Sequence, residues 1–236
     1  MIYLDNSATT QPSKVCVDTM TELLTCAWGN PSSVHALGID AEKRLKAARA
    51  QVAQALGAEP ERVFFTSGGT EADNWALKGA AQLRRDKGRH IISTPFEHHA
   101  ILHSLETLEK EGFEITYLPV YENGRVRVED LVAAIRPDTA LVTVMMANNE
   151  IGTIQPIKEI AAVCKKHGVW CHTDAVQAVG AIPIDVQDLG VDMLSMSGHK
   201  FNAPKGIGAL YIRRGILPYN LIDGGGQEGR RRAGTE

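Results

Sequence analysis

The sequence lacks the features that mark exported, membrane-spanning and nucleic-acid-binding proteins. Its 236 residues carry a formal net charge of −3, so no overall positive charge attracts nucleic acid or an anionic membrane. No apolar window approaches the length that spans a bilayer. The N-terminal residues MIYLDNSATT have neither the basic nor the apolar region of a signal peptide. The one basic run, Arg230–Arg232, lies between glycines and favours a solvated loop.

Cysteine is scarce and has no recognisable spacing. The chain contains four cysteines, Cys16, Cys26, Cys164 and Cys171. They form neither a C-x-x-C pair nor a disulfide framework, so we expect reduced thiols and a cytoplasmic protein. Cys164, His167, Cys171 and His172 are near one another in sequence, but Cys171 and His172 are neighbours on an expected strand. Neighbours on a strand point to opposite faces, and we therefore expect no metal site.

Strands and helices alternate along the chain. After an extended arm at residues 1–12, apolar residues recur at helical spacing from Ala36 to Leu56, and Gly57 is placed to end that helix. Further helices are expected at 13–26, from about 70, from about 98 to 111, at 128–135 and at 157–167. Strands are expected at 62–66, 89–94, 114–118, 139–147, 168–173, 191–196 and 207–213. The alternation predicts an α/β fold whose central sheet is mainly parallel and flanked by helices.

A lysine follows one of the buried strands. Residues 195–200 read S-M-S-G-H-K and end an apolar run that begins at Val191. In open α/β sheets, ligands bind at the C-terminal ends of the strands. Burial there would lower the pKa of Lys200 and make its amine a nucleophile. Taken alone, the hexamer is equally compatible with a surface lysine after a strand.

A glycine-rich turn links another strand to a helix. Residues 67–74 read S-G-G-T-E-A-D-N, in which the glycines let backbone N–H groups approach an anion at the start of a helix. The turn is neither a Walker nor a G-x-G-x-x-G sequence. The alternative is a plain turn in which Thr70 is the helix N-cap.

Polar side chains follow three more strands. His98 and His99 lie at a strand-to-helix junction, Asn149 follows the strand at 139–147, and Asp174 and Gln177 follow the strand at 168–173. Asp174 could instead be the N-cap of a helix that begins at residue 175. The sheet would bring these residues to one edge, beside the lysine and the glycine turn. A lysine amine, a phosphate cradle, a carboxylate and an imidazole ring together describe a site for pyridoxal 5'-phosphate (PLP).

Nine motifs carry a resemblance to a known family. They read Y-L-D-N-S-A-T-T, G-N-P-S-S-V-H, F-T-S-G-G-T-E-A-D-N, E-H-H-A, N-N-E-I-G-T-I-Q-P-I, H-T-D-A-V-Q-A-V-G, S-G-H-K, P-K-G-I-G-A-L-Y and G-G-G-Q-E-G. The sequence resembles the cysteine desulfurases of the NifS and IscS type, which are PLP enzymes with the class V aminotransferase fold. The resemblance implies that L-cysteine and a sulfur acceptor give L-alanine and a persulfide, whose sulfur supplies iron–sulfur cluster assembly.

The resemblance also implies roles for individual residues. Lys200 matches the Schiff-base lysine, and Asp174 matches the partner of the pyridinium nitrogen. His98 matches the histidine that stacks on the ring, with His99 as second choice. Gln177 would bond the phenolic oxygen, and Asn149 would lie near ring and substrate. The phosphate ligands would be Gly69, Thr70, Ser197, His199 and, from the other subunit of a homodimer, Thr235.

The resemblance further implies a domain division. Residues 1–14 would be an N-terminal arm, part of the small domain in the family, and residues 15–236 a large PLP-binding domain truncated before the C-terminal small domain. The family carries its catalytic cysteine and the arginine for the substrate carboxylate in that C-terminal segment, so we expect this chain alone to be inactive. The partners implied are L-cysteine, a second copy and an iron–sulfur scaffold or other acceptor protein. A selenocysteine lyase-like enzyme and a catalytically silent PLP domain remain as alternatives.

Overall fold

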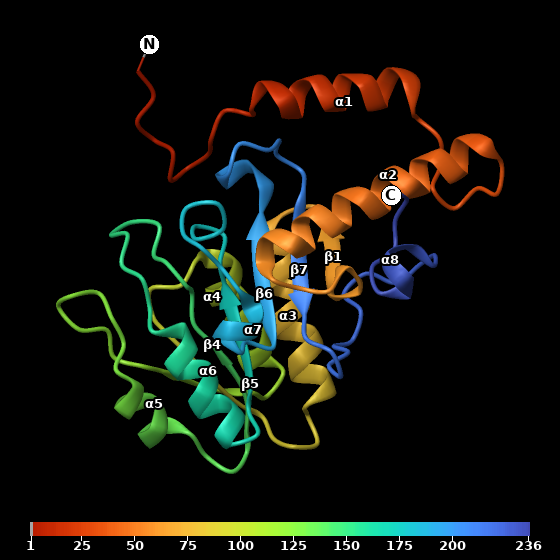
Figure 1. The fold of residues 1–236 in the computed structure, drawn as a ribbon. Helices are drawn as coiled ribbons and strands as arrows, with labels where there is room; N and C mark the ends of the chain where they lie inside the picture. The colour runs from red at the N-terminus through yellow and green to blue at the C-terminus, as the bar shows by residue number, and fades with distance from the viewer. Residues whose placement is uncertain (1) are drawn as a thin grey trace.

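The computed structural model describes residues 2–236 (Figure 1). The α-helices are α1 (Lys14–Cys26), α2 (Ala36–Leu56), α3 (Gly69–Leu83), α4 (His99–Lys110), α5 (Val128–Ala134), α6 (Ile157–Lys166), α7 (Val186–Leu189) and α8 (Gln227–Arg230). The strands are β1 (Val63–Thr66), β2 (His90–Ser93), β3 (Glu114–Tyr117), β4 (Thr139–Thr143), β5 (Trp170–Asp174), β6 (Met193–Ser197) and β7 (Gly208–Ile212). Two short 3-10 helices are η1 (Pro60–Arg62) and η2 (Gly198–Lys200).

The strands form one seven-stranded sheet in the order β1-β7-β6-β5-β4-β2-β3. Strands β3, β2, β4, β5 and β6 pair in parallel, and β7 runs antiparallel to both of its neighbours, β1 and β6. The predicted α/β fold with a mainly parallel sheet is therefore confirmed. The pairing of Asp174 with Ser195 and of Ser197 with Gly208 brings the C-terminal ends of β5 and β6 to one edge.

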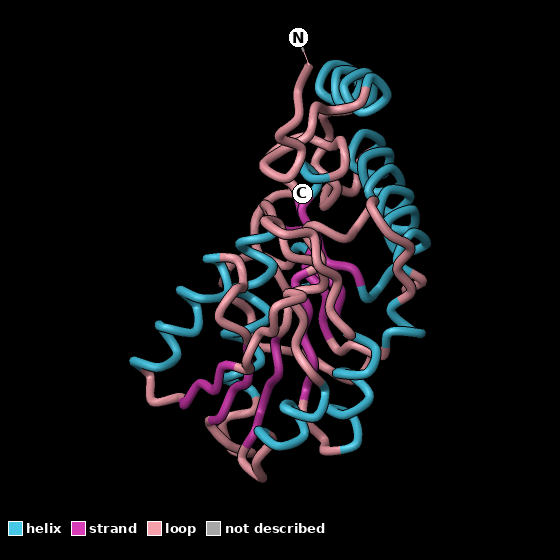
Figure 2. The backbone as a smooth tube through the Cα atoms, turned by 90° about the vertical axis from the view of Figure 1, so that its left-hand side faces the viewer, coloured by secondary structure: helices cyan, strands magenta, loops and turns pink. Residues whose placement is uncertain are grey.

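Consecutive residues of the central strands bury their side chains on opposite faces of the sheet, as the two-residue period of a strand requires. Ile91 and Leu141 pack on one face with α3 and α4, whereas Ile92 and Val142 pack on the other with α2 and α6. Figure 2 shows the sheet between these helices. Because helices pack on both faces of the sheet, the positions of the strands are fixed. The loops that follow the strands therefore also begin at fixed positions.

The strand expected at 139–147 is shorter than predicted. β4 ends at Thr143, although the N–H of Met146 still donates to the carbonyl of Asp174 at 2.8 Å. No α-helix begins at residue 175, because residues 175–181 form turns in which Ala178 N–H donates to the Ala175 carbonyl. The interpretation of Asp174 as the N-cap of a helix is therefore wrong.

The N-terminal arm and α1 lie apart from the helices that cover the sheet. In both views α1 is the outermost helix, beyond α2 (Figures 1 and 2), and none of its residues is buried. The arm instead contacts the chain at the C-terminal end of β6, where Thr10 N–H donates to the His199 carbonyl at 2.8 Å. Within residues 2–236, no helix is both long and apolar enough to cross a membrane.

Candidate active site

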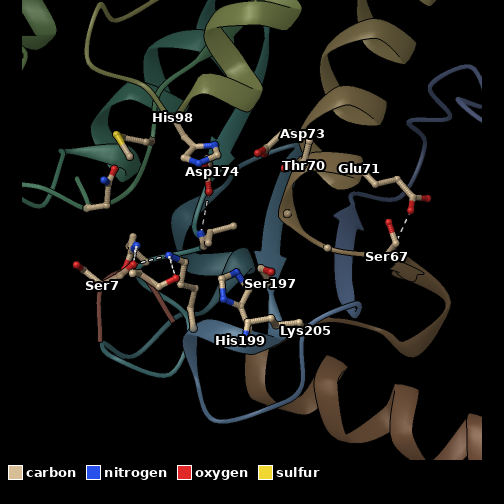
Figure 3. A pocket seen from close by; sticks show the side chains of 18 of the residues that line it. Ser7, Ser67, Thr70, Glu71, Asp73, His98, Asp174, Ser197, His199 and Lys205 are labelled. Atoms are coloured by element: carbon tan, nitrogen blue, oxygen red, sulfur yellow. Dashed lines mark hydrogen bonds between the residues drawn. The ribbon is translucent and has the colours of Figure 1, made fainter. Parts of the chain in front are cut away.

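A cavity of about 660 Å³ opens at the edge where β1, β5 and β6 end. Figure 3 shows side chains from these strand ends around it. The predicted site residues line the cavity, with the exception of Thr235 and of His99, the second choice for the ring-stacking histidine. Those that line it are Gly69, Thr70, His98, Asn149, Asp174, Gln177, Ser197, His199 and Lys200. Thr235 lies in the exposed C-terminal segment, outside the cavity.

Lys200 ends the short helix η2, directly after β6. Its Nζ donates to the carbonyl of Ser7 and, at 3.0 Å, to the carbonyl of Ala8, both in the N-terminal arm. Burial lowers the pKa of Lys200, while the carboxylates of Asp174 and Asp5 oppose the shift. The amine is therefore held in place by two backbone carbonyls and loses its proton more readily than an exposed lysine does.

Asp174 is the last residue of β5 and is almost fully buried. Its Oδ1 accepts a hydrogen bond from Val176 N–H at 2.9 Å. Burial raises the pKa of Asp174 to about 6, against the opposing effects of that hydrogen bond and of Lys200. The carboxylate is consequently ionised at neutral pH and would pair with a cationic group in the cavity. On the neighbouring turn, Gln177 donates through Nε2 to the Ser7 carbonyl at 2.8 Å.

The glycine turn after β1 leads directly into α3. The N-cap is Gly68, so the interpretation of Thr70 as the N-cap is wrong, and no side chain caps this end of the helix. A Cβ at Gly69 would lie 2.7 Å from Val176 Cγ2, so glycine lets the start of α3 approach the turn after β5. The helix N-terminus therefore presents backbone N–H groups and partial positive charge at the cavity, as an anion site requires.

The two adjacent histidines have different surroundings, and only one of them lines the cavity. His98 is the N-cap of α4, where its Nδ1 accepts from Ala100 N–H at 3.1 Å, and its ring lines the cavity. Burial lowers the pKa of His98, and His99 and Lys200 lower it further, so the ring is neutral near pH 7. The ring of His99 instead stacks on that of His103, with centroids 5.1 Å apart, and does not line the cavity.

Five charged residues that line the cavity had no predicted role, namely Asp5, Glu71, Asp73, Glu150 and Lys205. Asp73 lies on α3, and its Oδ1 is buried without a hydrogen-bond partner. It follows Gly69 and Thr70 by four and three residues, so helical spacing could have placed it on their face. Lys205 lies in the P-K-G sequence and lines the cavity beside His199 (Figure 3), which adds positive charge to its wall.

The cysteines lie away from the cavity. Cys16 is half-buried and Cys26 exposed, both in α1, whereas Cys164 and Cys171 are buried in the core. None of these four thiols lines the cavity. Within residues 2–236, no three His, Cys, Asp or Glu side chains are grouped so that they could hold a metal ion.

Comparison with known proteins agrees with this arrangement. The sequence model of the family described as aminotransferase class-V matches residues 2–229. The chain belongs to the class-V aminotransferase family. Enzymes of this family use PLP, and curated relatives that the chain matches are described as cysteine desulfurases of the IscS type. The sequence resemblance is thereby confirmed at the level of the family.

Individual relatives extend the comparison. The chain is 54% identical over 235 residues to a cysteine desulfurase IscS of Methanosarcina thermophila, and the match covers all of this chain and 58% of that protein. It is 43% identical to the solved structure of a NifS-like protein, with a TM-score of 0.97 and coverage of 100% of this chain and 65% of that one. A structure described as SspA in complex with cysteine gives a TM-score of 0.97 at 40% identity and is covered to 69%. The chain thus spans about 58% of the length of the Methanosarcina relative.

Proposed function

We propose that this chain binds PLP and forms the PLP-binding part of a cysteine desulfurase. The observation that carries the proposal is the convergence of three groups on one cavity: the Lys200 amine, the buried Asp174 carboxylate and the uncapped N-terminus of α3. Each suits one polar part of the cofactor, respectively its aldehyde, its ring nitrogen and its phosphate. The relatives that are described as cysteine desulfurases support the proposed reaction.

The residues of the cavity fit the cofactor. Asp174 would hold the ring nitrogen, the Gln177 amide would face the phenolic oxygen, and His98 would cover the ring. Backbone N–H groups at Gly69 and Thr70, with Ser197, His199 and Lys205, would hold the phosphate. When bound, PLP supplies an aldehyde that reacts with amines and a ring that accepts electrons from the substrate.

The chain itself provides proton handling and orientation. The carbonyls of Ser7 and Ala8 fix the Lys200 amine, and burial makes that amine easier to deprotonate. Because Nδ1 of His98 accepts from Ala100 N–H, the neutral imidazole carries its proton on Nε2 and can donate a hydrogen bond from that atom. Asp174, ionised above about pH 6, keeps a negative charge at the inner end of the cavity.

The reaction proposed for the longer protein takes L-cysteine and a sulfur acceptor to L-alanine and a persulfide. Because no cysteine of this chain lines the cavity, we propose that the chain alone does not release sulfur from cysteine. We also propose that a second copy joins it through the segment that contains Thr235, and that an iron–sulfur scaffold or other acceptor protein takes the sulfur. The reducing, cytoplasmic compartment expected from the cysteines stays a prediction.

The test is an absorbance spectrum of the chain titrated with PLP. We expect a band in the visible region in the parent and in a Lys166→Ala control, which changes an exposed lysine on α6. The band should be absent from Lys200→Ala, because Lys200, and not the Lys205 that also lines the cavity, is the amine held by the carbonyls of Ser7 and Ala8. A circular dichroism spectrum of Lys200→Ala like that of the parent excludes misfolding. A parent without the band, or a Lys200→Ala variant that keeps it, contradicts the proposal.

A further inference from the structure

An acidic side chain lies where the proposed function needs to bind an anion. Glu71 is in the first turn of α3, next to Gly69 and Thr70, and it lines the cavity. Burial raises the pKa of Glu71, but hydrogen bonds from Arg232 and Ser67 outweigh it and leave this pKa below its ordinary value. The carboxylate therefore stays ionised, and an unpaired negative charge there would repel a phosphate and occupy the positive end of the helix.

Arg232 neutralises this carboxylate by a two-point contact. Its Nε donates to Glu71 Oε1 at 2.7 Å, and its Nη2 donates to Oε2 at 3.0 Å. The N–H of Ser67 also donates to Oε2, at 2.7 Å. Figure 3 shows Glu71 directed toward Ser67, on the side away from His98 and Asp174. Both carboxylate oxygens are thus engaged by Arg232 and by Ser67, at the start of the glycine turn.

The segment that contains Arg232 is itself anchored to the sheet. Glu228 is buried, and its carboxylate accepts hydrogen bonds from Nη1 and Nη2 of Arg49, a residue of α2, at 2.6 and 2.7 Å. The same carboxylate accepts from the N–H of Phe65 in β1 at 2.8 Å. A second anchor four residues before Arg232 therefore fixes the backbone from which the guanidinium reaches α3.

We propose that Arg232 is a positioning residue for phosphate binding: it holds the Glu71 carboxylate on the side of Ser67, away from the backbone N–H groups of Gly69 and Thr70, and cancels its charge. The inference rests on the proposed function, because the phosphate is that of PLP. It also corrects the interpretation of Arg230–Arg232 as a solvated loop. That interpretation is wrong for Arg232, whose side chain is 22% exposed and paired.

Three variants, compared with the parent, isolate the charge effect. Arg232→Gln leaves Glu71 ionised and unpaired, and we expect PLP binding to weaken about tenfold, as one nearby like charge does at a partly exposed site. Adding Glu71→Gln removes the unpaired charge, so the double variant should recover affinity to within about threefold of the parent. Arg231→Gln makes the same charge change on a neighbouring arginine that forms no ion pair within residues 2–236, and it should bind as the parent does.

Pyridoxal, the same aldehyde without the phosphate, serves as the second probe. It tests the lysine and the ring site but not the phosphate site, so its Lys200-dependent band should titrate alike in the parent and in all three variants. Thermal unfolding of the chain without cofactor, with and without inorganic phosphate, gives a readout that needs no reaction at the lysine. Phosphate should raise the melting temperature of the parent and of the double variant more than that of Arg232→Gln.

The outcomes separate this inference from the proposed function. If the parent binds PLP and Arg232→Gln binds it equally well, the role of Arg232 is refuted while the proposed function stands. A double variant no better than Arg232→Gln, or an Arg232→Gln variant equally impaired toward pyridoxal, shows a structural role only and also refutes the inference. If the parent binds neither PLP nor phosphate, both proposals fall.

Discussion

At the scale of single residues, burial determines which acid groups near the site carry charge. Glu97 lies between β2 and α4 and is buried, and its Oε1 accepts from Thr94 Oγ1 at 2.5 Å and from Met145 N–H at 2.9 Å. Burial raises the pKa of Glu97 to about 8, although these two hydrogen bonds oppose the rise and the nearby Asp174 adds to it. Glu97 is therefore neutral at pH 7, whereas Asp174 is ionised there.

The raised pKa of Glu97 predicts a pH-dependent stability. Between the unfolded value of 4.5 and the folded value of about 8, the folded chain binds a proton that the unfolded chain has released, so the free energy of unfolding falls as the pH rises through this window. Glu97→Gln stays neutral in both states and should lack that contribution. We expect urea unfolding at several pH values to show that the free energy of unfolding of the variant increases relative to that of the parent from pH 5 to pH 8. The increase should be at most about 1.4 kcal/mol per unit of pKa difference between the folded and unfolded states.

A matched control keeps this prediction specific. Glu106→Gln makes the same change on the exposed face of α4 and should leave the difference from the parent independent of pH. A Glu97→Gln variant whose difference from the parent stays constant between pH 5 and pH 8 would mean that Glu97 is ionised in the folded chain.

At the scale of elements, the N-terminal arm closes one side of the candidate site. Thr10 makes the central contact, because its Oγ1 donates to the His199 carbonyl at 2.8 Å and accepts from Asn202 N–H at 2.7 Å. The arm thereby covers η2, the element that presents Lys200. This arrangement joins residues almost two hundred positions apart, so local patterns in the sequence do not predict it.

Thr10→Val keeps the shape of the side chain and removes both hydroxyl contacts. Because both hydrogen bonds are lost but the exposed Asn202 N–H can bond to water, we expect the free energy of unfolding to fall by about 0.5–1.5 kcal/mol. Hydrogen exchange should become faster at residues 198–203 and not in the strands of the sheet. Thr21→Val is the control, since Thr21 Oγ1 bonds only within α1, to the Val17 carbonyl. Equal exchange at 198–203 in Thr10→Val and the parent would falsify the role given to the arm.

At the scale of the whole molecule, the sequence predicts the alternation of strands and helices. Each buried strand is a short apolar run, and apolar residues recur along each helix with the helical period. It also predicts Asp174 and Lys200 as site residues, since ligands gather where parallel strands end. It does not predict the contact of Arg232 with Glu71 or of Lys200 with Ser7, because each joins segments that only the folded sheet brings together. In the sequence, the basic run at 230–232 looks like a solvated loop, because the pattern does not show that Glu71 is the partner of Arg232.

The molecule also exposes large apolar side chains on and beside α1, and exposed apolar patches mark surfaces of association. Val17, Met20 and Leu24 follow one another at three- and four-residue spacing, so they share one face of that helix. Their exposed fractions are 49%, 40% and 73%, and Trp28, which follows the helix, is 70% exposed. Because burial of this surface is favourable at roughly 25 cal/mol per Å², we expect the chain to associate with itself at high concentration.

Light scattering after size-exclusion chromatography over a wide range of concentrations measures this association. Met20→Lys combined with Leu24→Lys places two charges on the apolar face without lowering helix propensity, and it should shift the chain toward monomer. Leu83→Lys, at the end of α3 and 39% exposed, makes the same kind of change elsewhere and should leave the association as in the parent. A parent that stays monomeric at every concentration contradicts the prediction, and so does equal dissociation by Leu83→Lys. Dissociation by the α1 variant alone identifies this helix face as the surface through which the copies meet.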